Sequence, residues 1–325
     1  MQSVDQIKKS ISNELQEFET FFKTEIKSQA YLLNTITKYI LKTKGKQMRP
    51  MLVFLSAKLH GNISKSTYSA AFLIELMHTA TLIHDDVVDD SMTRRGLFSV
   101  NALWKNKIAV LVGDFFLSKG LLHAVREKEF ALLEIVSDAV KEMSEGELIQ
   151  MEKARMLNIT EDIYFEVIEK KTASLIAAAM LAGARSVSED ENSDLLKIKK
   201  IGILIGLAFQ IKDDIFDYEQ VSLIGKPTGN DIKERKITLP LLHVISKSNS
   251  EEKKWIYSIL KKHNTDTQKV KSLIDFVKTN GGIQYSINKM NSLKEEALTL
   301  LHTYPESEAR EAFESLIQYI TDRKK

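Results

Sequence analysis

A run of 176 consecutive residues without proline, from Met51 to Lys226, dominates this sequence of 325 residues. Proline breaks helices because it lacks a backbone N–H and clashes with the preceding turn, so such a run favours helices joined by short turns. Apolar residues there recur at helical spacing, in the stripe Leu73, Leu76, Met77, Ala80, Ile83 and Val87. Strand-like alternation is rare, and the sequence therefore predicts an all-α fold.

We expect a single all-helical domain over residues 1–325, a bundle of about ten to thirteen helices around a central catalytic cavity. The expected helices span about residues 4–26, 29–43, 49–60, 66–90, 107–126, 129–155, 161–184, 191–220, 236–247, 251–262, 267–279, 282–302 and 306–322. The segment VSLIGKPTGNDIKERK (221–236) is rich in glycine, proline and lysine, which predicts an exposed, mobile loop.

Composition excludes several classes of function. Lysine and arginine (46) nearly balance aspartate and glutamate (44), so we expect no nucleic-acid binding. The absence of cysteine excludes disulfides and thiolate metal sites and suits a reducing cytoplasm. The longest apolar runs, 174–184 and 201–209, are shorter than the roughly 20 residues that span a bilayer, and the first residues lack the apolar core of a signal peptide. We therefore expect a soluble, cytoplasmic protein.

The pattern D-D-x-x-D occurs twice, each time at the end of an apolar helical run. Its members are Asp85, Asp86 and Asp89 in DDVVD, and Asp213, Asp214 and Asp217 in DDIFD. Positions i, i+1 and i+4 of a helix lie within an arc of about 100°, so each trio of carboxylates faces one way. Like charges about 4 Å apart repel by roughly 4 kcal/mol at an effective dielectric constant near 20, so a sheltered trio needs a counter-cation. Oxygen ligands on rigid helices suit Mg²⁺ shared with substrate phosphates.

The plainer interpretation is that these aspartates are solvated helix ends. Recurrence of the pattern beside two apolar helix faces favours the metal site, and the D-x-D-x-D-G spacing of a calcium-binding loop is absent. A diphosphate also needs direct cationic contacts, which arginine and lysine provide. The residues in position to supply them are Lys46, Arg49, Arg94, Arg95, Lys171 with the neighbouring Thr172, Lys226 and Lys236.

The order of these motifs resembles the trans-isoprenyl diphosphate synthases, most closely the long-chain polyprenyl members. In family order they are GKQMRP (45–50), MHTATLIHDDVVDDSMTRRG (77–96), VLVGDF (110–115), GELIQ (146–150), KTASL (171–175), FQIKDDIFD (209–217) and GKPTGNDIKERKITLP (225–240). The resemblance implies a prenyltransferase of isoprenoid biosynthesis. An allylic diphosphate held by Mg²⁺ would lose its diphosphate, the double bond of isopentenyl diphosphate would attack the allylic cation, and a proton would leave.

The resemblance also implies a role for each matched residue. Metal would be held by Asp85, Asp86, Asp89, Asp213, Asp214 and Asp217, with about three Mg²⁺ ions per loaded site. The allylic diphosphate would be bound by Arg94, Lys171, Lys226 and Lys236, and isopentenyl diphosphate by Lys46, Arg49, His78 and Arg95. Thr172 and Gln210 would turn oxygen atoms toward the developing cation. Glu147 and Gln150 would lie near the cavity, whereas we interpret His84 and Asp114 as structural and Asp90, Lys233 and Arg235 as surface charges.

Product length depends on the helical residues that precede Asp85. In short-chain members of the family an aromatic side chain at the position of Ala80 or Thr81 blocks the tunnel, and here both residues are small. We therefore expect a product longer than twenty carbons, about six to eight isoprene units, of the kind that becomes a quinone side chain. The floor of the tunnel would be Met77, Ile74 or a residue within 132–136.

Four other functions share some of these features. A terpene cyclase or head-to-head synthase can carry D-D-x-x-D, but typically lacks the GKxxRP element and the second aspartate motif with its lysine loop. A silent regulatory subunit generally loses motif residues, and a plain Mg²⁺-binding scaffold leaves Lys46, Arg49 and Lys171 unexplained. A short-chain farnesyl or geranylgeranyl diphosphate synthase stays open. The family suggests a homodimer, with residues 108–122 as a candidate interface and transient membrane contact for product release.

Overall fold

The computed structural model describes residues 4–42, 47–94, 96–188, 193–219 and 229–323, and these residues are almost entirely helical. Unit 1 comprises Met1–Val140, Leu175–Gly202 and His302–Leu316, and unit 2 comprises Lys141–Ser174, Ile203–Leu301 and Ile317–Lys325. The all-α fold class is confirmed. The expectation of one domain over residues 1–325 stays a prediction.

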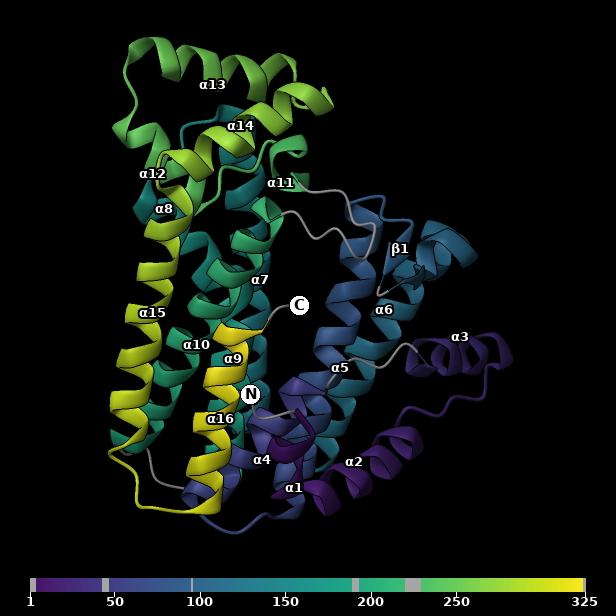
Figure 1. Ribbon diagram of the computed structural model, residues 1–325. Helices are drawn as coiled ribbons and strands as arrows, with labels where there is room; N and C mark the ends of the chain where they lie inside the picture. The colour runs from purple at the N-terminus through teal and green to yellow at the C-terminus, as the bar shows by residue number, and fades with distance from the viewer. Residues whose placement is uncertain (1–3, 43–46, 95, 189–192, 220–228, 324–325) are drawn as a thin grey trace. The chain divides into compact units, whose positions relative to one another are not determined.

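Unit 1 is built around two long helices. Its elements are α1 (Val4–Lys9), α2 (Ser12–Glu25), α3 (Tyr31–Lys42), α4 (Met48–His60), α5 (Lys65–Val88), β1 (Thr93–Arg94), β2 (Leu97–Phe98), α6 (Val100–Arg126), α9 (Ser174–Arg185) and the first parts of α7 (Phe130–Met156), α10 (Ser193–Tyr218) and α16 (Glu308–Asp322). Helices α5 and α6 pack side by side, and α2 and α4 pack against α5 (Figure 1). The strands form a small antiparallel hairpin that pairs Thr93 with Phe98 and Arg94 with Leu97.

Aromatic and small residues set the packing in unit 1. The rings of Phe22 and Phe72 join α2 to α5 with centroids 5.4 Å apart, in an edge-to-face arrangement that aromatic pairs favour. Helix α9 approaches α4 closely, because a Cβ atom on Gly183 would lie only 2.2 Å from the carbonyl oxygen of Val53. The hydroxyl of Ser56 donates to the carbonyl of Met180 at 2.5 Å across the same contact. This packing leaves the apolar stripe of α5 buried from Leu73 to Ile83, whereas Val87 is half-buried.

Unit 2 gathers shorter helices around a second core. Its elements are α8 (Glu161–Ile168), the π-helix η1 (Glu169–Ala173), α11 (Asn230–Lys233), α12 (Leu239–Lys247), α13 (Ser250–Lys262), α14 (Thr267–Thr279), α15 (Gly282–Leu301) and the remaining parts of α7, α10 and α16. Helices α12 and α14 pack against one end of α15 (Figure 1). Asn249 and Asp266 begin α13 and α14, since each side chain accepts two backbone N–H groups that a helix start leaves unpaired.

The helix boundaries agree with the expectations to within a few residues, apart from five differences. The expected helix 161–184 is interrupted by η1, and the expected helix 4–26 is divided into α1 and α2. Helix α6 begins at Val100 and bends at Lys105, whose φ of 71° is not helical, just before the expected start at 107. The hairpin β1–β2 and the short helix α11 were not expected, and α11 corrects part of the loop expected over 221–236. These elements have two to four residues each and are too short to show a periodicity in the sequence.

Candidate active site

The first aspartate motif lies where α5 ends in unit 1. Asp85 and Asp86 belong to the last turn, and Asp89 is the C-cap, whose backbone N–H donates to the carbonyl of Asp85 at 2.8 Å. The three side chains differ in exposure: Asp86 is only 2% exposed, Asp85 is half-buried and Asp89 is exposed. One carboxylate of the motif is therefore part of the protein interior, and two can reach a ligand from outside.

Arg94 neutralises the buried carboxylate. Its Nε donates to Oδ1 of Asp86 at 2.7 Å, and the hairpin β1–β2 holds the arginine in that position. Burial raises the pKa of Asp86, while the hydrogen bond and the charge of Arg94 oppose the rise. The structure thus brings together two residues that the sequence assigned to metal and to the allylic diphosphate. Arg95, next in the sequence, lies outside the described residues.

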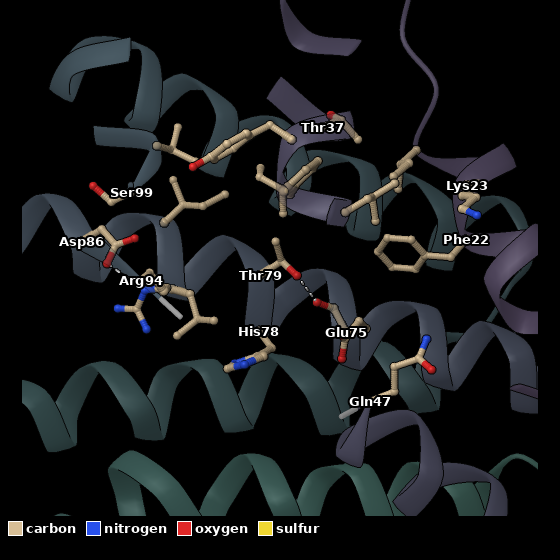
Figure 2. A pocket seen from close by; sticks show the side chains of 18 of the residues that line it. Phe22, Lys23, Thr37, Gln47, Glu75, His78, Thr79, Asp86, Arg94 and Ser99 are labelled. Atoms are coloured by element: carbon tan, nitrogen blue, oxygen red, sulfur yellow. Dashed lines mark hydrogen bonds and ion pairs between the residues drawn. The ribbon is translucent and has the colours of Figure 1, made fainter. Parts of the chain in front are cut away.

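A mostly apolar pocket, here called the unit 1 pocket, continues from this pair along α5. Figure 2 shows Asp86 and Arg94 at one end of the pocket and Phe22 and Lys23 at the other. His78, predicted to bind isopentenyl diphosphate, lines it and is 8% exposed. Arg49 is a half-buried residue in the first turn of α4, and Lys46 lies outside the described residues. Their predicted roles stay predictions.

The residues predicted to set chain length lie on a different face of α5 from this pocket. Ala80 is fully buried, Met77 is 5% exposed and Thr81 is half-buried, and none of them lines the pocket. Met77 points toward α6, where a Cβ atom on Gly120 would meet its Cε at 2.5 Å. Among the candidates for the tunnel floor, Ile74, Leu132 and Val136 are buried. A tunnel along this face stays a prediction.

The second group of predicted residues comes together in unit 2 around one pocket, here called the unit 2 pocket. It is lined by Gln150, Lys153, Ala154, Ile159, Tyr164, Val167, Ile168, Lys171, Thr172, Gln210, Asp214, Asp231, Arg235, Lys236, Ile237 and Thr238. Five of these were predicted as site residues: Lys171, Thr172, Gln210, Asp214 and Lys236. They come from η1, α10 and the segment after α11, so only the tertiary structure unites them. Lys226, a sixth expected member, lies outside the described residues.

A chain of hydrogen bonds orders the polar side of the unit 2 pocket. The hydroxyl of Thr172 donates to Oε1 of Gln210 at 2.8 Å, and Nε2 of Gln210 donates to Oδ1 of Asp214 at 2.8 Å. The hydroxyl of Tyr164 donates to the other oxygen of Asp214 at 2.7 Å. The Gln210 amide is fixed in one orientation by these partners, and Asp214 is held from both sides.

The π-helix η1 places Lys171 and Thr172 in the pocket wall. A π-helical turn inserts an extra residue into a helix and is frequent at functional sites, because it turns side chains that regular geometry would point elsewhere. Two glycines let neighbouring helices approach η1: a Cβ atom on Gly146 would lie 2.9 Å from the backbone nitrogen of Lys171, and one on Gly206 would lie 2.4 Å from Cα of Ala173. Lys171 forms a close ion pair with Glu147, the residue expected near the cavity.

Asp217 and Asp213 have partners within unit 2 that the motif did not reveal. Both oxygens of Asp217 accept backbone N–H groups, from Asn230 at 3.0 Å and Asp231 at 3.1 Å, at the start of α11. Oδ1 of Asp213 accepts from Nη2 of Arg323 at 2.5 Å. The three aspartates of the second motif therefore have three different sets of partners.

Negative charge accumulates around Asp214. Its side chain is 4% exposed, and burial together with the nearby carboxylate of Asp231 raises the pKa of Asp214 to about 8. Burial and the carboxylate of Asp217 likewise raise the pKa of Asp231 to about 7. Carboxyl groups whose pKa values are raised by burial and by each other's charge mark a place where a cation would be stabilised.

The donor chemistry fits Mg²⁺, which prefers carboxylate oxygen and is commonly held by one or two carboxylates, waters and substrate phosphates. Asp213 and Asp214 would hold it in unit 2, and Asp85 and Asp89 have the exposure to do so in unit 1. Within the described ranges no three histidine or carboxylate side chains converge on a single ion position. Water molecules or oxygen atoms of a diphosphate would complete the coordination of a metal ion here.

Sequence reasoning missed three residues of these sites. Tyr164 and Asp231 line the unit 2 pocket, and Arg323 pairs with Asp213. Arg235, interpreted as a surface charge, also lines that pocket. Only Asp231 gave a signal, because it stands within the motif GKPTGNDIKERK, whereas Tyr164 lies in ordinary amphipathic helical sequence and Arg323 directly follows such a helix. His84 lies 3.5 Å from Asp114 between α5 and α6, consistent with the structural interpretation of both.

Known proteins share the sequence motifs and the fold of this chain. The sequence model of the polyprenyl synthetase family matches residues 30–277. The chain belongs to this family. A relative of this polyprenyl synthetase, the all-trans-nonaprenyl-diphosphate synthase (geranyl-diphosphate specific) of Rhodobacter capsulatus, is 33% identical over 320 residues, 96% of each chain.

Relatives of this chain include synthases named for long-chain products and synthases named for short-chain products. The crystal structure of a decaprenyl diphosphate synthase from Rhodobacter capsulatus superposes with a TM-score of 0.93 at 29% identity, covering 99% of this chain and 100% of that one. The short chain isoprenyl diphosphate synthase of Methanothermobacter thermautotrophicus is 33% identical over 296 residues, 88% of this chain and 89% of its own. The interpretation of the sequence as a prenyltransferase of isoprenoid biosynthesis is confirmed by this family membership.

Proposed function

We propose that this polyprenyl synthetase condenses an allylic diphosphate with successive isopentenyl diphosphates and releases a long-chain all-trans polyprenyl diphosphate. The observation that carries the proposal is the unit 2 pocket, where Lys171 and Lys236 share one wall with Thr172, Gln210 and Asp214. Two cations beside a buried carboxylate suit a diphosphate that binds together with a metal ion. The family membership supports the same reaction.

The residues of the pocket have distinct tasks in this proposal. Mg²⁺, when bound, would stabilise the negative charge of the departing diphosphate. Lys171 would exchange its ion pair with Glu147 for diphosphate oxygen, and Lys236 would similarly leave Glu234, which lies 2.5 Å away. Tyr164 and Gln210 would keep Asp214 in one orientation, so that no reorganisation is needed when the ligand arrives. We also propose that Arg94, beside Asp86 in unit 1, binds diphosphate.

A long product is favoured over a short one by two observations. Ala80 has no bulk to close a tunnel along its face of α5, and the relatives from Rhodobacter capsulatus are named nonaprenyl and decaprenyl synthases. A short-chain product is the second candidate, because the relative from Methanothermobacter thermautotrophicus carries that name. We propose about six to eight isoprene units, destined for a quinone side chain.

We propose that two copies associate through α6. That helix exposes a row of large apolar side chains, Leu103, Val110, Leu111, Leu121, Leu122 and Val125. Exposed apolar surface of this extent marks an interaction site. By length and composition α6 could also cross a membrane, with 39% of its most apolar window buried in the structure. We favour a homodimer in the cytoplasm that contacts a membrane surface only transiently to release product.

One incubation tests the proposed reaction. The purified protein is mixed with farnesyl diphosphate, isopentenyl diphosphate and Mg²⁺, with and without a chelator, and the products are measured by mass spectrometry. We expect a ladder ending at about 30 to 40 carbons that the chelator abolishes. Products that stop at fifteen or twenty carbons would support the short-chain candidate, and a cyclic or head-to-head product would refute the proposed reaction.

A further inference from the structure

Arg323, directly after α16, occupies a position next to the second aspartate motif that the proposed chemistry does not use. Its Nη2 lies 2.5 Å from Oδ1 of Asp213, and the guanidinium lies 4.2 Å from the ring centroid of Phe209 and 5.5 Å from that of Phe216. The arginine side chain is 16% exposed, and that of Asp213 is 41% exposed. All four residues belong to unit 2.

The surroundings of Arg323 favour a positive charge beside Asp213 and allow the guanidinium to change position. Aromatic faces attract a guanidinium, so Phe209 and Phe216 retain Arg323 near α10 without fixing it to a single acceptor. The Nε of Arg323 is buried and has no hydrogen-bond partner among the described residues. A guanidinium built only to hold the fold would have its buried donors satisfied. Here one carboxylate contact, a long hydrogen bond of 3.5 Å from Nη2 to the backbone carbonyl of Phe209 and two ring faces hold it.

The contact between Arg323 and Asp213 also offsets the repulsion among neighbouring carboxylates. Asp213 is followed directly by Asp214 on α10, and Asp217 lies one helical turn further along the same helix. Without a cation the most exposed of these carboxylates would repel its neighbours and turn toward solvent. A guanidinium on Oδ1 of Asp213 supplies the missing charge on the side where a metal ion would otherwise bind.

We propose that Arg323 is a placeholder cation, a positioning residue that keeps Asp213 in its ligand geometry until Mg²⁺ replaces the guanidinium. The proposal rests on the proposed function, since it takes Asp213 as a metal ligand. Arg323 and Mg²⁺ compete for the same oxygen, so metal binding releases the arginine. The freed guanidinium then presents its donors to anionic groups that accompany the metal.

The test measures metal binding by the metal-free protein, by calorimetry and by thermal shift, with MgCl₂ alone as the probe. Arg323→Met removes the charge and keeps apolar contact with the two rings. We expect the Mg²⁺ concentration at half-saturation to fall by about three- to tenfold, the range of a partly exposed charge pair. Arg323→Lys keeps the charge and should stay near the unaltered protein. Lys294→Gln, which removes the ion pair with the adjacent Asp322, is the matched control and should leave the value unchanged.

A double-mutant cycle distinguishes a placeholder role of Arg323 from a purely structural contact with Asp213. Without Mg²⁺, the effects of Arg323→Met and Asp213→Asn on unfolding should be coupled, and saturating Mg²⁺ should abolish the coupling. Two results would overturn the placeholder while leaving the proposed function intact. One is coupling that persists unchanged in Mg²⁺. The other is an equal Mg²⁺ concentration at half-saturation in Arg323→Met and Lys294→Gln. If the unaltered protein shows no response to Mg²⁺ at all, the metal assignment itself is wrong and the placeholder with it.

Discussion

Replacing Asp214 with asparagine should stabilise the metal-free protein. In the folded chain, burial and the neighbouring Asp231 raise the pKa of Asp214 from 3.8 to about 8. The fold therefore binds a proton that the unfolded chain releases, and stability falls as pH rises from about 4 to about 8. Each pKa unit corresponds to about 1.4 kcal/mol, so the ionisable side chain costs up to roughly 6 kcal/mol above pH 8 and about 3 kcal/mol at pH 6.

Asparagine avoids this cost because the hydrogen-bond chain can reverse. Its amide NH₂ would donate to Oε1 of Gln210 once that side chain flips, and the flipped Gln210 would donate to the hydroxyl of Thr172, which accepts as readily as it donates. Tyr164 would keep its bond to the remaining oxygen. The replacement thus removes the charge and keeps one hydrogen bond each with Gln210 and Tyr164, while the second amide N–H of the asparagine gains no acceptor from these three residues, which offsets part of the gain.

Thermal and urea unfolding in chelator measure the effect between pH 6 and pH 8.5. We expect Asp214→Asn to be more stable than the unaltered protein, with an advantage that grows by up to about 3 kcal/mol across this range. Asp275→Asn, an exposed change in the same unit, corrects for the altered net charge. Prenyl transfer should be largely lost. A variant that is less stable at every pH, or whose advantage does not change with pH, would refute the electrostatic reasoning.

Three further replacements follow from the same structure. Ala80→Phe should shorten the product and cost about 1–3 kcal/mol of stability by overpacking a fully buried position, and an unchanged product length by mass spectrometry would reject the tunnel along this face. Lys171→Ala should lower kcat/KM for the allylic diphosphate by about 10²-fold, whereas Lys170→Ala, whose ammonium pairs with Glu145 at 2.9 Å, should change it by less than about threefold. Leu111→Glu puts a charge on a side chain that is 63% exposed and should give a monomer in light scattering, so a persistent dimer would place the interface elsewhere.

The sequence by itself determined the helical architecture and the chemistry of the site. Helical periodicity is a local property, because residues three and four apart share a face whatever the rest of the chain does. The recurrence of D-D-x-x-D and the basic motifs around it likewise depend only on residue type and spacing. They identified Lys171, Thr172 and Asp214, the family resemblance added Gln210, and all four line one pocket in the structure.

Tertiary structure alone decided which partner each of these residues has. The helical arc predicted one shared face for Asp213, Asp214 and Asp217 but none of their partners: Asp213 pairs with Arg323, 110 positions away, and Asp217 accepts backbone N–H groups at the start of α11. Asp214 is held by Tyr164, 50 positions earlier in the chain. Contacts at such separations depend on how whole helices pack, and no spacing rule within a single helix contains that information. The π-helix at Lys171 was not predicted for the same reason. It is packed closely against Gly146 and Gly206, which are distant in sequence. Helical periodicity alone does not distinguish a π-helical turn from a regular helix.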